Sequence, residues 1–422
     1  MKAAIYTLGC KVNQYESELI SQELKKSSYE LVSHNDISDI YIVNSCTVTA
    51  ESDKKTRQAV RRFRRKNPDA IIVLTGCIPQ AWPDIFDKLP EADIVIGNNN
   101  NSAVVSEINN YINTKKRTAN IRPHIDGEPF PCGIISDFSE RTRAIVKIED
   151  GCNRFCSYCI IPYARGRVRS KPLDVLKEEL TILDNKGFKE IVLVGINLSA
   201  YGLNEEFNIC DAVELAEGFS SFERIRLGSL EPDHLTDEII DRLSKCKKLC
   251  PQFHISLQSG CDKTLKEMNR HYTSDEYYSI AKKLRESFTD ATITTDIMVG
   301  FPNEDDEDFE ESLKFAYKVG FEKMHVFPYS PREGTPAAKK VQINPQIKEE
   351  RSHRMLAAAN EIRVEFLKKQ IGKTVNVLIE NNNEGYTENY TPVKSLTDIE
   401  CGKMVKIKIT DSDENRCYGI IE

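Results

Sequence analysis

The stretch Gly151-Cys152-Asn153-Arg154-Phe155-Cys156-Ser157-Tyr158-Cys159 places three cysteines in eight residues, with the spacing C-x3-C-x2-C. A loop of this kind can give one thiolate to each of three irons of a four-iron cluster and leave the fourth iron open to a small molecule. A zinc site is the alternative, but it needs a fourth ligand, and the nearest histidines are His124 and His234. The loop therefore predicts a 4Fe-4S cluster with one open iron.

The composition narrows the class of protein. The 422 residues include 58 Lys and Arg against 65 Asp and Glu, a formal net charge of −7, so a nucleic-acid partner needs a local basic patch. The sequence has no apolar run long enough to span a bilayer, and its N-terminus lacks the features of a signal peptide. Thirteen cysteines without an export signal favour metal or redox chemistry over disulfides, and we expect a cytoplasmic protein.

Residues 1–115 alternate short apolar runs with helix-like stretches, which predicts a doubly wound parallel α/β domain. Cys10, Cys46 and Cys77 follow three of these runs. Because parallel strands end at one edge of a sheet, and ligands bind beyond that edge, the three cysteines should converge in space. They predict a second metal cluster with an open ligand position. The alternative is that each is an ordinary buried cysteine that packs as a small apolar residue.

The N-terminal part of the sequence also contains a basic segment and a predicted linker. Residues 54–66 carry eight Lys and Arg residues directly after the Cys46 segment. They form either a solvated helix face or a contact for the phosphate backbone of a nucleic acid. Residues 116–140, which contain several Pro and Gly residues, are predicted to be a linker, and Cys132 within them has no partner at a ligand spacing.

Residues 141–370 continue the strand–helix alternation with six apolar runs, at 144–148, 191–195, 224–228, 253–257, 293–299 and 323–327. Six strands rather than eight predict a partial, open (β/α)6 barrel, whose chemistry lies at the carboxyl ends of its strands. The cysteine loop follows the first strand and so lies at the mouth. Asn197, Ser229 and Glu231 follow other strands. Each alone could be a turn or capping residue, but as a set they predict a surface for an extended polar cofactor.

Residues 371–422 alternate apolar and polar positions in short runs, as in Val375, Val377 and Ile379. This pattern predicts a small antiparallel β-barrel. Acids outnumber bases in the segment, so its charge does not distinguish RNA binding from protein docking.

The cysteine loop, with Tyr158 before its last cysteine, resembles the cluster loop of the radical S-adenosylmethionine (SAM) superfamily. Three more stretches, Thr7-Leu8-Gly9-Cys10-Lys11-Val12-Asn13-Gln14, His254-Ile255-Ser256-Leu257-Gln258-Ser259-Gly260 and Phe327-Pro328-Tyr329-Ser330-Pro331-Arg332-Glu333-Gly334-Thr335, resemble its methylthiotransferase family. The resemblance covers essentially the whole chain. The C-terminal segment resembles the RNA-binding TRAM domain of that family.

The resemblance implies two 4Fe-4S clusters and SAM as cofactors. Cys152, Cys156 and Cys159 would bind the cluster that cleaves SAM to a 5′-deoxyadenosyl radical. Cys10, Cys46 and Cys77 would bind an auxiliary cluster, near which a second SAM molecule donates a methyl group to sulfur. The reaction would insert a methylthio group into an unactivated C–H bond. The residues that would contact SAM are Tyr158, Asn197, Ser229 and Glu231.

Within the family, residues 9–14 most resemble the branch that methylthiolates C2 of N6-threonylcarbamoyladenosine (t6A) at position 37 of tRNA. The implied partners are the tRNA anticodon stem-loop and an electron donor such as flavodoxin or ferredoxin, with a monomeric protein and no membrane. Branches acting on N6-isopentenyladenosine (i6A) in tRNA, or on an aspartate of ribosomal protein S12, are alternatives. A non-catalytic iron–sulfur RNA-binding regulator, with clusters but no cofactor pocket, is an alternative of a different class.

Overall fold

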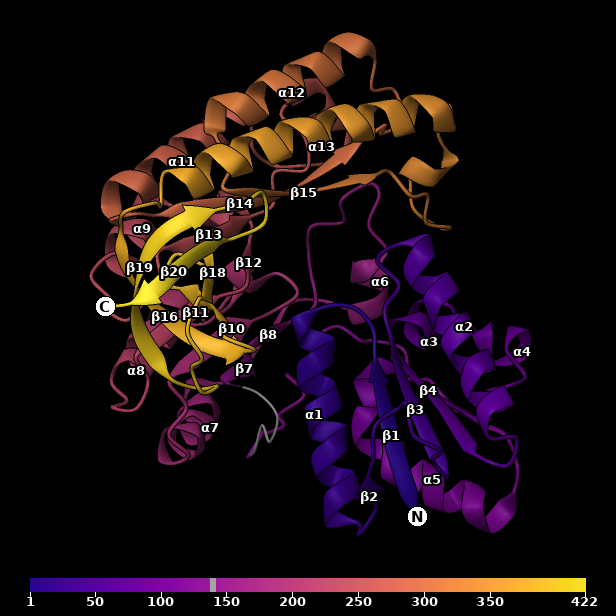
Figure 1. The fold of residues 1–422 in the computed structure, drawn as a ribbon. Coiled ribbons are helices and arrows are strands. Elements are labelled where there is room, and N and C mark those ends of the chain that lie inside the picture. Colours follow the sequence, from indigo (N-terminus) through magenta and orange to yellow (C-terminus); the bar gives the residue numbers. More distant parts are fainter. Residues whose placement is uncertain (137–141) are drawn as a thin grey trace.

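The computed structural model describes residues 1–136 and 142–422. They form an N-terminal sheet covered by helices, a central open barrel and a small closed β-barrel near the C-terminus (Figure 1). The predicted fold class is confirmed. The predicted boundary between a linker that ends at 140 and a domain that starts at 141 lies outside the described residues. Among the described helices, none is both long and apolar enough to cross a membrane.

The N-terminal sheet has the strand order β2-β1-β3-β4-β5-β6, and every pair is parallel. Its strands are β1 (Lys2–Thr7), β2 (Glu30–Leu31), β3 (Ile40–Ser45), β4 (Ile71–Gly76), β5 (Ile94–Ile96) and β6 (Thr118–Asn120). The two central strands, β3 and β4, are buried at every position because helices cover both faces of the sheet. The edge strands β2 and β6 are too short to show in the apolar pattern, and β6 comes from the segment that the sequence assigns to the linker.

Two sets of helices flank this sheet. On one face, α1 (Lys11–Lys26) and α5 (Val104–Thr114) pack through Ile20, Leu24 and Ile108. On the other face lie α2 (Ala50–Lys66), α3 (Cys77–Ala81) and α4 (Ile85–Lys88), with Val60 and Phe63 of α2 in the core. Cys10 caps the start of α1, three residues after β1 ends, and Cys77 is the first residue of α3, directly after β4, so both lie at turns from strand to helix.

The central barrel is built from two parallel sheets, β11-β10-β7 and β12-β13-β14-β15. Its strands are β7 (Arg143–Lys147), β10 (Glu190–Val194), β11 (Arg224–Leu227), β12 (Ser229–Leu230), β13 (Gln252–Ile255), β14 (Thr292–Val299) and β15 (Lys323–Pro328). The predicted strand 224–228 corresponds to β11, and β12, which follows Gly228 in the second sheet, was not predicted. A short pair, β8 (Glu149–Asp150) and β9 (Arg169–Ser170), lies beside the mouth.

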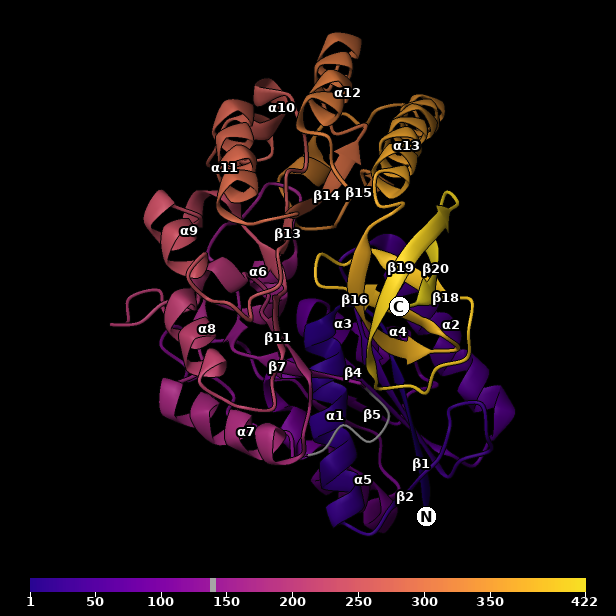
Figure 2. The same cartoon turned by 60° about the vertical axis from the view of Figure 1, so that its left-hand side comes forward.

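Helices cover the outside of this barrel, as Figure 2 shows. They are α7 (Leu173–Asn185), α8 (Ile209–Glu217), α9 (Asp237–Leu243), α11 (Ser274–Ser287), α12 (Asp306–Val319) and α13 (Pro345–Lys368), with the shorter α6 (Ile161–Arg165) and α10 (Asp262–Glu267) near the mouth. Local sequence sets their ends: Asp305 and Asp308 form a capping box at the start of α12, and Gly320 ends it in the left-handed conformation.

The C-terminal strands close a barrel in the order β16-β17-β18-β20-β19. They are β16 (Thr374–Asn381), β17 (Glu384–Thr387), β18 (Pro392–Ser395), β19 (Met404–Ser412) and β20 (Cys417–Ile421), and only the β18–β20 pair is parallel. Arg143 and Arg224, the first residues of β7 and β11, bond to Glu380 and to the Tyr386 carbonyl of this barrel. The small barrel therefore covers the amino ends of the central strands, opposite the cysteine loop.

Candidate active site

The structure brings Cys10, Cys46 and Cys77 together beyond the carboxyl ends of β1, β3 and β4. Gly9 has a φ of +101°, and a Cβ there would lie 2.6 Å from the Cβ of Cys46, so only glycine allows this approach. Burial raises the pKa of Cys77 to about 12, and the neighbouring thiols of Cys46 and Cys10 add to the rise. A metal bound here would displace thiol protons. Their role as ligands stays a prediction.

Cys152, Cys156 and Cys159 lie on the loop between β8 and α6. Gly151 opens the loop with a φ of +89°, and a Cβ there would lie 1.9 Å from the carbonyl oxygen of Arg167. The Cys159 N–H donates to the Cys156 carbonyl at 2.9 Å, which folds the loop into a turn. Burial raises the pKa of Cys152 to about 12, so this thiol is also protonated without a metal.

Arg270 and Glu231 lie beside this loop. Nη1 of Arg270 is 3.3 Å from Sγ of Cys156, and its Nη2 forms an ion pair with Glu231. Burial raises the pKa of Glu231, and Arg270 opposes that rise. The structure therefore places Glu231 as the partner of Arg270, a positioning role that the sequence did not reveal.

The other residues predicted to contact the cofactor differ in how deeply they are buried. Tyr158 is half-buried, with its ring 6.3 Å from that of Phe301. Ser229 is exposed on β12 and is the strand partner of His254, on the wall of the barrel interior. Asn197 is buried beyond β10, and its N–H donates to Glu149 at 2.7 Å.

Several buried polar atoms at the mouth have no hydrogen-bond partner within the described residues: Glu149 Oε1, Asn197 Oδ1, Gln258 Oε1 and Tyr329 OH. Each lies beyond the carboxyl end of a barrel strand. An unpaired buried polar group costs about 1–3 kcal/mol, so a polar ligand that pairs with these atoms would be stabilised. Burial also raises the pKa of Glu149 well above its ordinary value. These oxygens can accept hydrogen bonds, which fits the amino group and hydroxyls of SAM. Of the four residues, only Asn197 was predicted to bind it.

A buried charge network joins α1 to the central barrel. Arg165, the last residue of α6, donates from Nε to Sγ of Cys77 at 3.2 Å and from Nη2 to Glu16 at 3.0 Å. Lys147 of β7 donates to the same Glu16 carboxylate at 2.9 Å. Because α6 begins two residues after Cys159 and is about 8 Å long, it spans the gap between the two cysteine groups. No sequence pattern signals these residues.

A second bridge crosses the same interface. Arg332, beyond β15, donates to Thr47 at 2.7 Å and to Asp53 at 2.6 Å, and its guanidinium lies 5.6 Å from the ring of Trp82. Thr47 directly follows Cys46. The central barrel thus contacts Cys77 itself and the residue that follows Cys46, and both cysteine groups lie near one interface.

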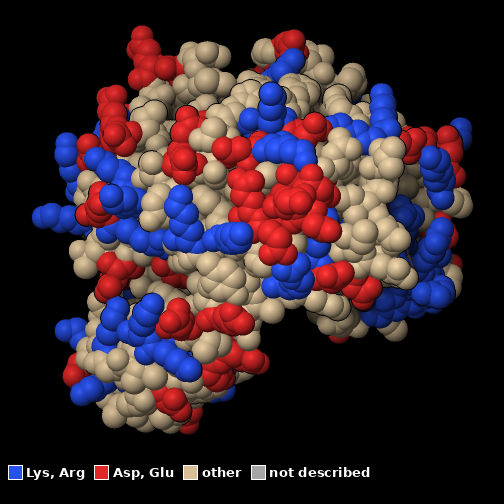
Figure 3. Space-filling view, turned by 90° about the horizontal axis from the view of Figure 1, so that it is seen from above, with Lys and Arg blue, Asp and Glu red and all other residues tan. Residues whose placement is uncertain are grey.

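The basic segment on α2 is partly used within the fold. Arg61 and Arg64 pair with Glu91 and Asp93, and Arg62 lies 4.7 Å from the ring of Phe63. Lys55 and Arg65 are exposed, and the described residues offer them no ion pair. Figure 3 shows Lys and Arg side chains along its right-hand edge, the side on which Figure 1 places α2. Fewer than the eight Lys and Arg residues of this segment are therefore available to bind a polyanion such as RNA.

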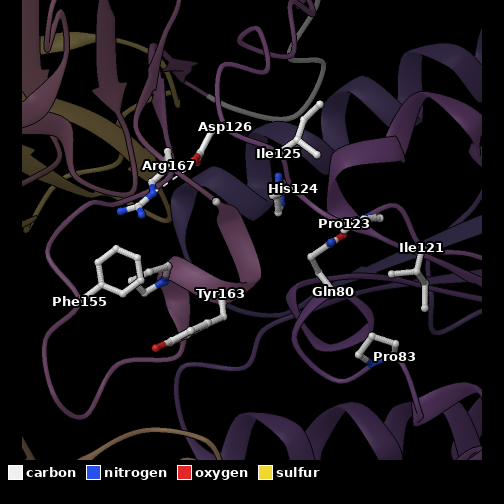
Figure 4. Close-up of a pocket in the computed structure, with 12 residues that line it drawn as sticks. Gln80, Pro83, Ile121, Pro123, His124, Ile125, Asp126, Phe155, Tyr163 and Arg167 are labelled. Atoms are coloured by element: carbon white, nitrogen blue, oxygen red, sulfur yellow. Dashed lines mark ion pairs between the residues drawn. The ribbon is translucent and has the colours of Figure 1, made fainter.

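Beside the cysteine loop lies a pocket of about 490 Å³ that the sequence did not reveal (Figure 4). Phe155 and Tyr163 line one side at 5.8 Å between ring centroids, and Gln80 and Pro83 line the other. The Arg167 guanidinium lies 4.7 Å from the ring of Phe155. Aromatic rings with an adjacent arginine form surfaces on which nucleobases stack.

Comparison with known proteins identifies the class. The Radical SAM superfamily matches residues 146–316, and Uncharacterized protein family UPF0004 matches residues 2–97. The radical SAM methyltransferase TsrM from Kitasatospora setae, solved with cobalamin and a 4Fe-4S cluster bound, superposes with a TM-score of 0.59 over 80% of this chain and 77% of that one. At 15% identity this likeness concerns the fold. The fold and the cysteine loop define a radical SAM enzyme, which implies SAM and a 4Fe-4S cluster.

Relatives that match this chain over nearly its full length identify its family. "Threonylcarbamoyladenosine tRNA methylthiotransferase MtaB" of Aquifex aeolicus is 37% identical over 97% of this chain and 100% of its own length. The Bacillus subtilis protein of the same name is 37% identical over 96% of this chain and 93% of its own. The "tRNA-2-methylthio-N(6)-dimethylallyladenosine synthase" of Clostridium novyi is 36% identical over 99% of this chain and 96% of its own. The chain belongs to the radical SAM methylthiotransferase family.

Proposed function

We propose that this protein methylthiolates C2 of t6A at position 37 of tRNA. The observation that carries the proposal is the full-length similarity, at 37% identity, to two proteins named for threonylcarbamoyladenosine. The Clostridium novyi relative is 36% identical and is named for N6-dimethylallyladenosine, which is i6A, so i6A is the second candidate substrate. We infer that the protein acts as a cytoplasmic monomer that receives electrons from a flavodoxin or ferredoxin.

We assign Cys152, Cys156 and Cys159 to the cluster that binds SAM, and Cys10, Cys46 and Cys77 to a second 4Fe-4S cluster. When bound, SAM and the clusters supply the radical, the sulfur and the methyl group. Around them, Arg270 and Arg165 each direct a guanidinium at a cysteine sulfur, and this positive charge favours the thiolate that binds iron. The buried Arg165 and Arg332 bridges hold the two cysteine groups at one interface and would exclude water from it.

For SAM itself, the unpaired oxygens of Asn197, Glu149 and Gln258 support a role in binding its amino group and hydroxyls. Tyr158 and Ser229 stay in the proposed site as wall residues, and Glu231 acts through Arg270. For RNA, the support comes from the pocket beside Phe155 and Tyr163 and from the exposed cations of α2. With a net charge of −7, such local features must carry the RNA contact.

Nucleoside mass spectrometry of tRNA from a strain that lacks the gene tests the substrate. We expect 2-methylthio-t6A to disappear and t6A to accumulate, with both restored by the wild-type gene but not by a Cys152→Ala variant. Unchanged 2-methylthio-t6A with lost 2-methylthio-i6A would establish the second candidate. Reduced, reconstituted protein should also release 5′-deoxyadenosine from SAM, whereas a non-catalytic RNA-binding regulator would release none.

A further inference from the structure

The inner face of the central barrel carries polar residues that no cysteine site uses. On β14, Ile293, Ile297 and Val299 point outward into the core beneath the helices, so Thr294 and Asp296 point into the barrel. By the same alternation His254 lies between the outward Phe253 and Ile255, and His325 lies between Met324 and Val326. Three neighbouring parallel strands thus present His254, Asp296 and His325 to the interior, and we call these residues the lumen triad.

The members of the lumen triad are mutual neighbours. Nε2 of His254 is 3.4 Å from Oδ2 of Asp296, and the two imidazole rings are 6.0 Å apart between centroids. One nitrogen or oxygen from each residue lies within 4.8 Å of the others. Nδ1 of His254 is held by Thr294 Oγ1 at 3.0 Å, which fixes the orientation of that ring. In the described chain His325 makes no hydrogen bond or ion pair, so its ring is available to a ligand.

The triad lies between the cysteine loop and the small barrel. Met298, the next inward residue after Asp296 and about 7 Å further along β14, packs with Phe301, and Tyr158 of the cysteine loop packs on the same cluster. In the other direction, Thr294 and Lys323 line a pocket of about 410 Å³ against the small barrel. A base that presents C2 at the barrel mouth would therefore direct its substituent toward the triad.

The chemistry of the triad favours a polar substituent. An apolar isopentenyl group would remove Asp296 and His325 from water without offering them hydrogen-bond partners, which is unfavourable for buried polar groups. A threonylcarbamoyl group offers a hydroxyl and urea N–H groups to Asp296, and a carboxylate to the imidazoles. Lys323, two residues before His325 on the same face, adds a cation on the carboxylate side.

We propose that His254, Asp296 and His325 form the site that recognises the polar N6 substituent of the target adenosine and so selects t6A over i6A. The inference rests on the proposed function of the enzyme. It assigns substrate selection to residues about 7 Å below the layer that contacts the cysteine loop.

The test compares wild type, His325→Leu and Asp296→Asn, reconstituted and reduced, on anticodon stem-loops that carry either t6A or i6A. His353→Leu, an exposed histidine of α13, is the matched control. We expect the ratio of kcat/KM for t6A over i6A to fall by about 10- to 100-fold in each lumen variant, the effect of losing one or two hydrogen bonds to a charged group. The control should keep the wild-type ratio, and iron content per chain verifies that each variant is folded.

The outcomes separate the two proposals. Wild type that leaves t6A RNA unmodified overturns the proposed function. Wild type that modifies t6A RNA, with the ratio unchanged in both lumen variants, overturns only the role of the triad. The same three ligand atoms could hold a divalent metal. One equivalent of zinc or manganese per chain, present in wild type and absent from His325→Leu, would overturn substrate recognition in favour of a metal site.

Discussion

At the scale of single residues, two arginines of the central barrel each face a cysteine sulfur, one in each cysteine group. Arg165 approaches Cys77 at 3.2 Å, and Arg270 approaches Cys156 at 3.3 Å. Hydrogen bonds and positive charge near cluster sulfurs are among the factors that set reduction potential. The sequence marks the cysteines by their spacing, but nothing marks the arginines, which lie 88 and 114 residues away from those partners.

Arg270→Gln should lower the reduction potential of the cluster bound at the C-x3-C-x2-C loop. Removing a positive charge beside Cys156 stabilises the oxidised cluster, by about 30–60 mV for a one-electron couple. A redox titration followed by electron paramagnetic resonance measures the shift. Lys403→Gln, on the exposed surface of the small barrel, is the control and should leave the potential unchanged. An unchanged potential in Arg270→Gln would show that Arg270 does not act on the cluster.

At the scale of elements, helices α1 and α6 meet through charges rather than apolar side chains. Glu16 of α1 is buried and pairs with Arg165 and Lys147. Burial opposes its ionisation, but the two cations outweigh burial and lower the pKa of Glu16 to about 2. Because removing one partner of a buried pair leaves an uncompensated charge, this contact is sensitive to single substitutions.

Glu16→Gln should lower the free energy of unfolding at pH 7 by about 3 kcal/mol. The folded-state pKa lies below the unfolded value, so the contribution of Glu16 is complete above about pH 4.5 and is lost as the pH falls toward 2. Urea unfolding of iron-free protein at pH 7 and pH 3.5 measures both effects, and the difference between wild type and variant should shrink at the lower pH. Glu23→Gln, from an exposed pair with Lys26, should cost at most about 1 kcal/mol. Equal losses in the two variants would contradict the argument.

At the scale of the whole molecule, the N-terminal sheet and the central barrel each contribute one cysteine group. The N-terminal sheet carries Cys10, Cys46 and Cys77, and the central barrel carries Cys152, Cys156 and Cys159 on one loop. The small barrel covers the amino ends of the central strands, so a large substrate must approach at the carboxyl ends, where both cysteine groups lie.

Anaerobic reconstitution should yield about eight irons per chain, four for each cluster. Replacing Cys10, Cys46 and Cys77 together with alanine should leave about four irons and preserve 5′-deoxyadenosine release, because the radical-generating group lies in the other part. Replacing Cys152, Cys156 and Cys159 should also leave about four irons but abolish that release. Replacing Cys210 and Cys246, which are buried in the core of the central barrel and belong to neither cysteine group, is the control. Iron content that does not change on loss of the first group would refute a second cluster.

The sequence by itself determined the class of this protein. The C-x3-C-x2-C spacing is a local property, and strand runs such as 40–43 and 71–74 report burial on both faces directly. The topology of a parallel sheet then requires Cys10, Cys46 and Cys77 to end at one edge. Short edge strands such as β6 and β12 escaped this reasoning because two or three residues carry too little periodicity.

Only the tertiary structure decided which polar residues meet. Glu16 with Arg165, Arg332 with Asp53, and His254 with Asp296 and His325 come from segments far apart in the chain. Periodicity states which face of an element is buried, but not what lies against that face, because register and crossing angle arise only when the elements pack together. For that reason the two groups of cysteines could be singled out from the sequence, whereas the arginines beside them and the lumen triad could not.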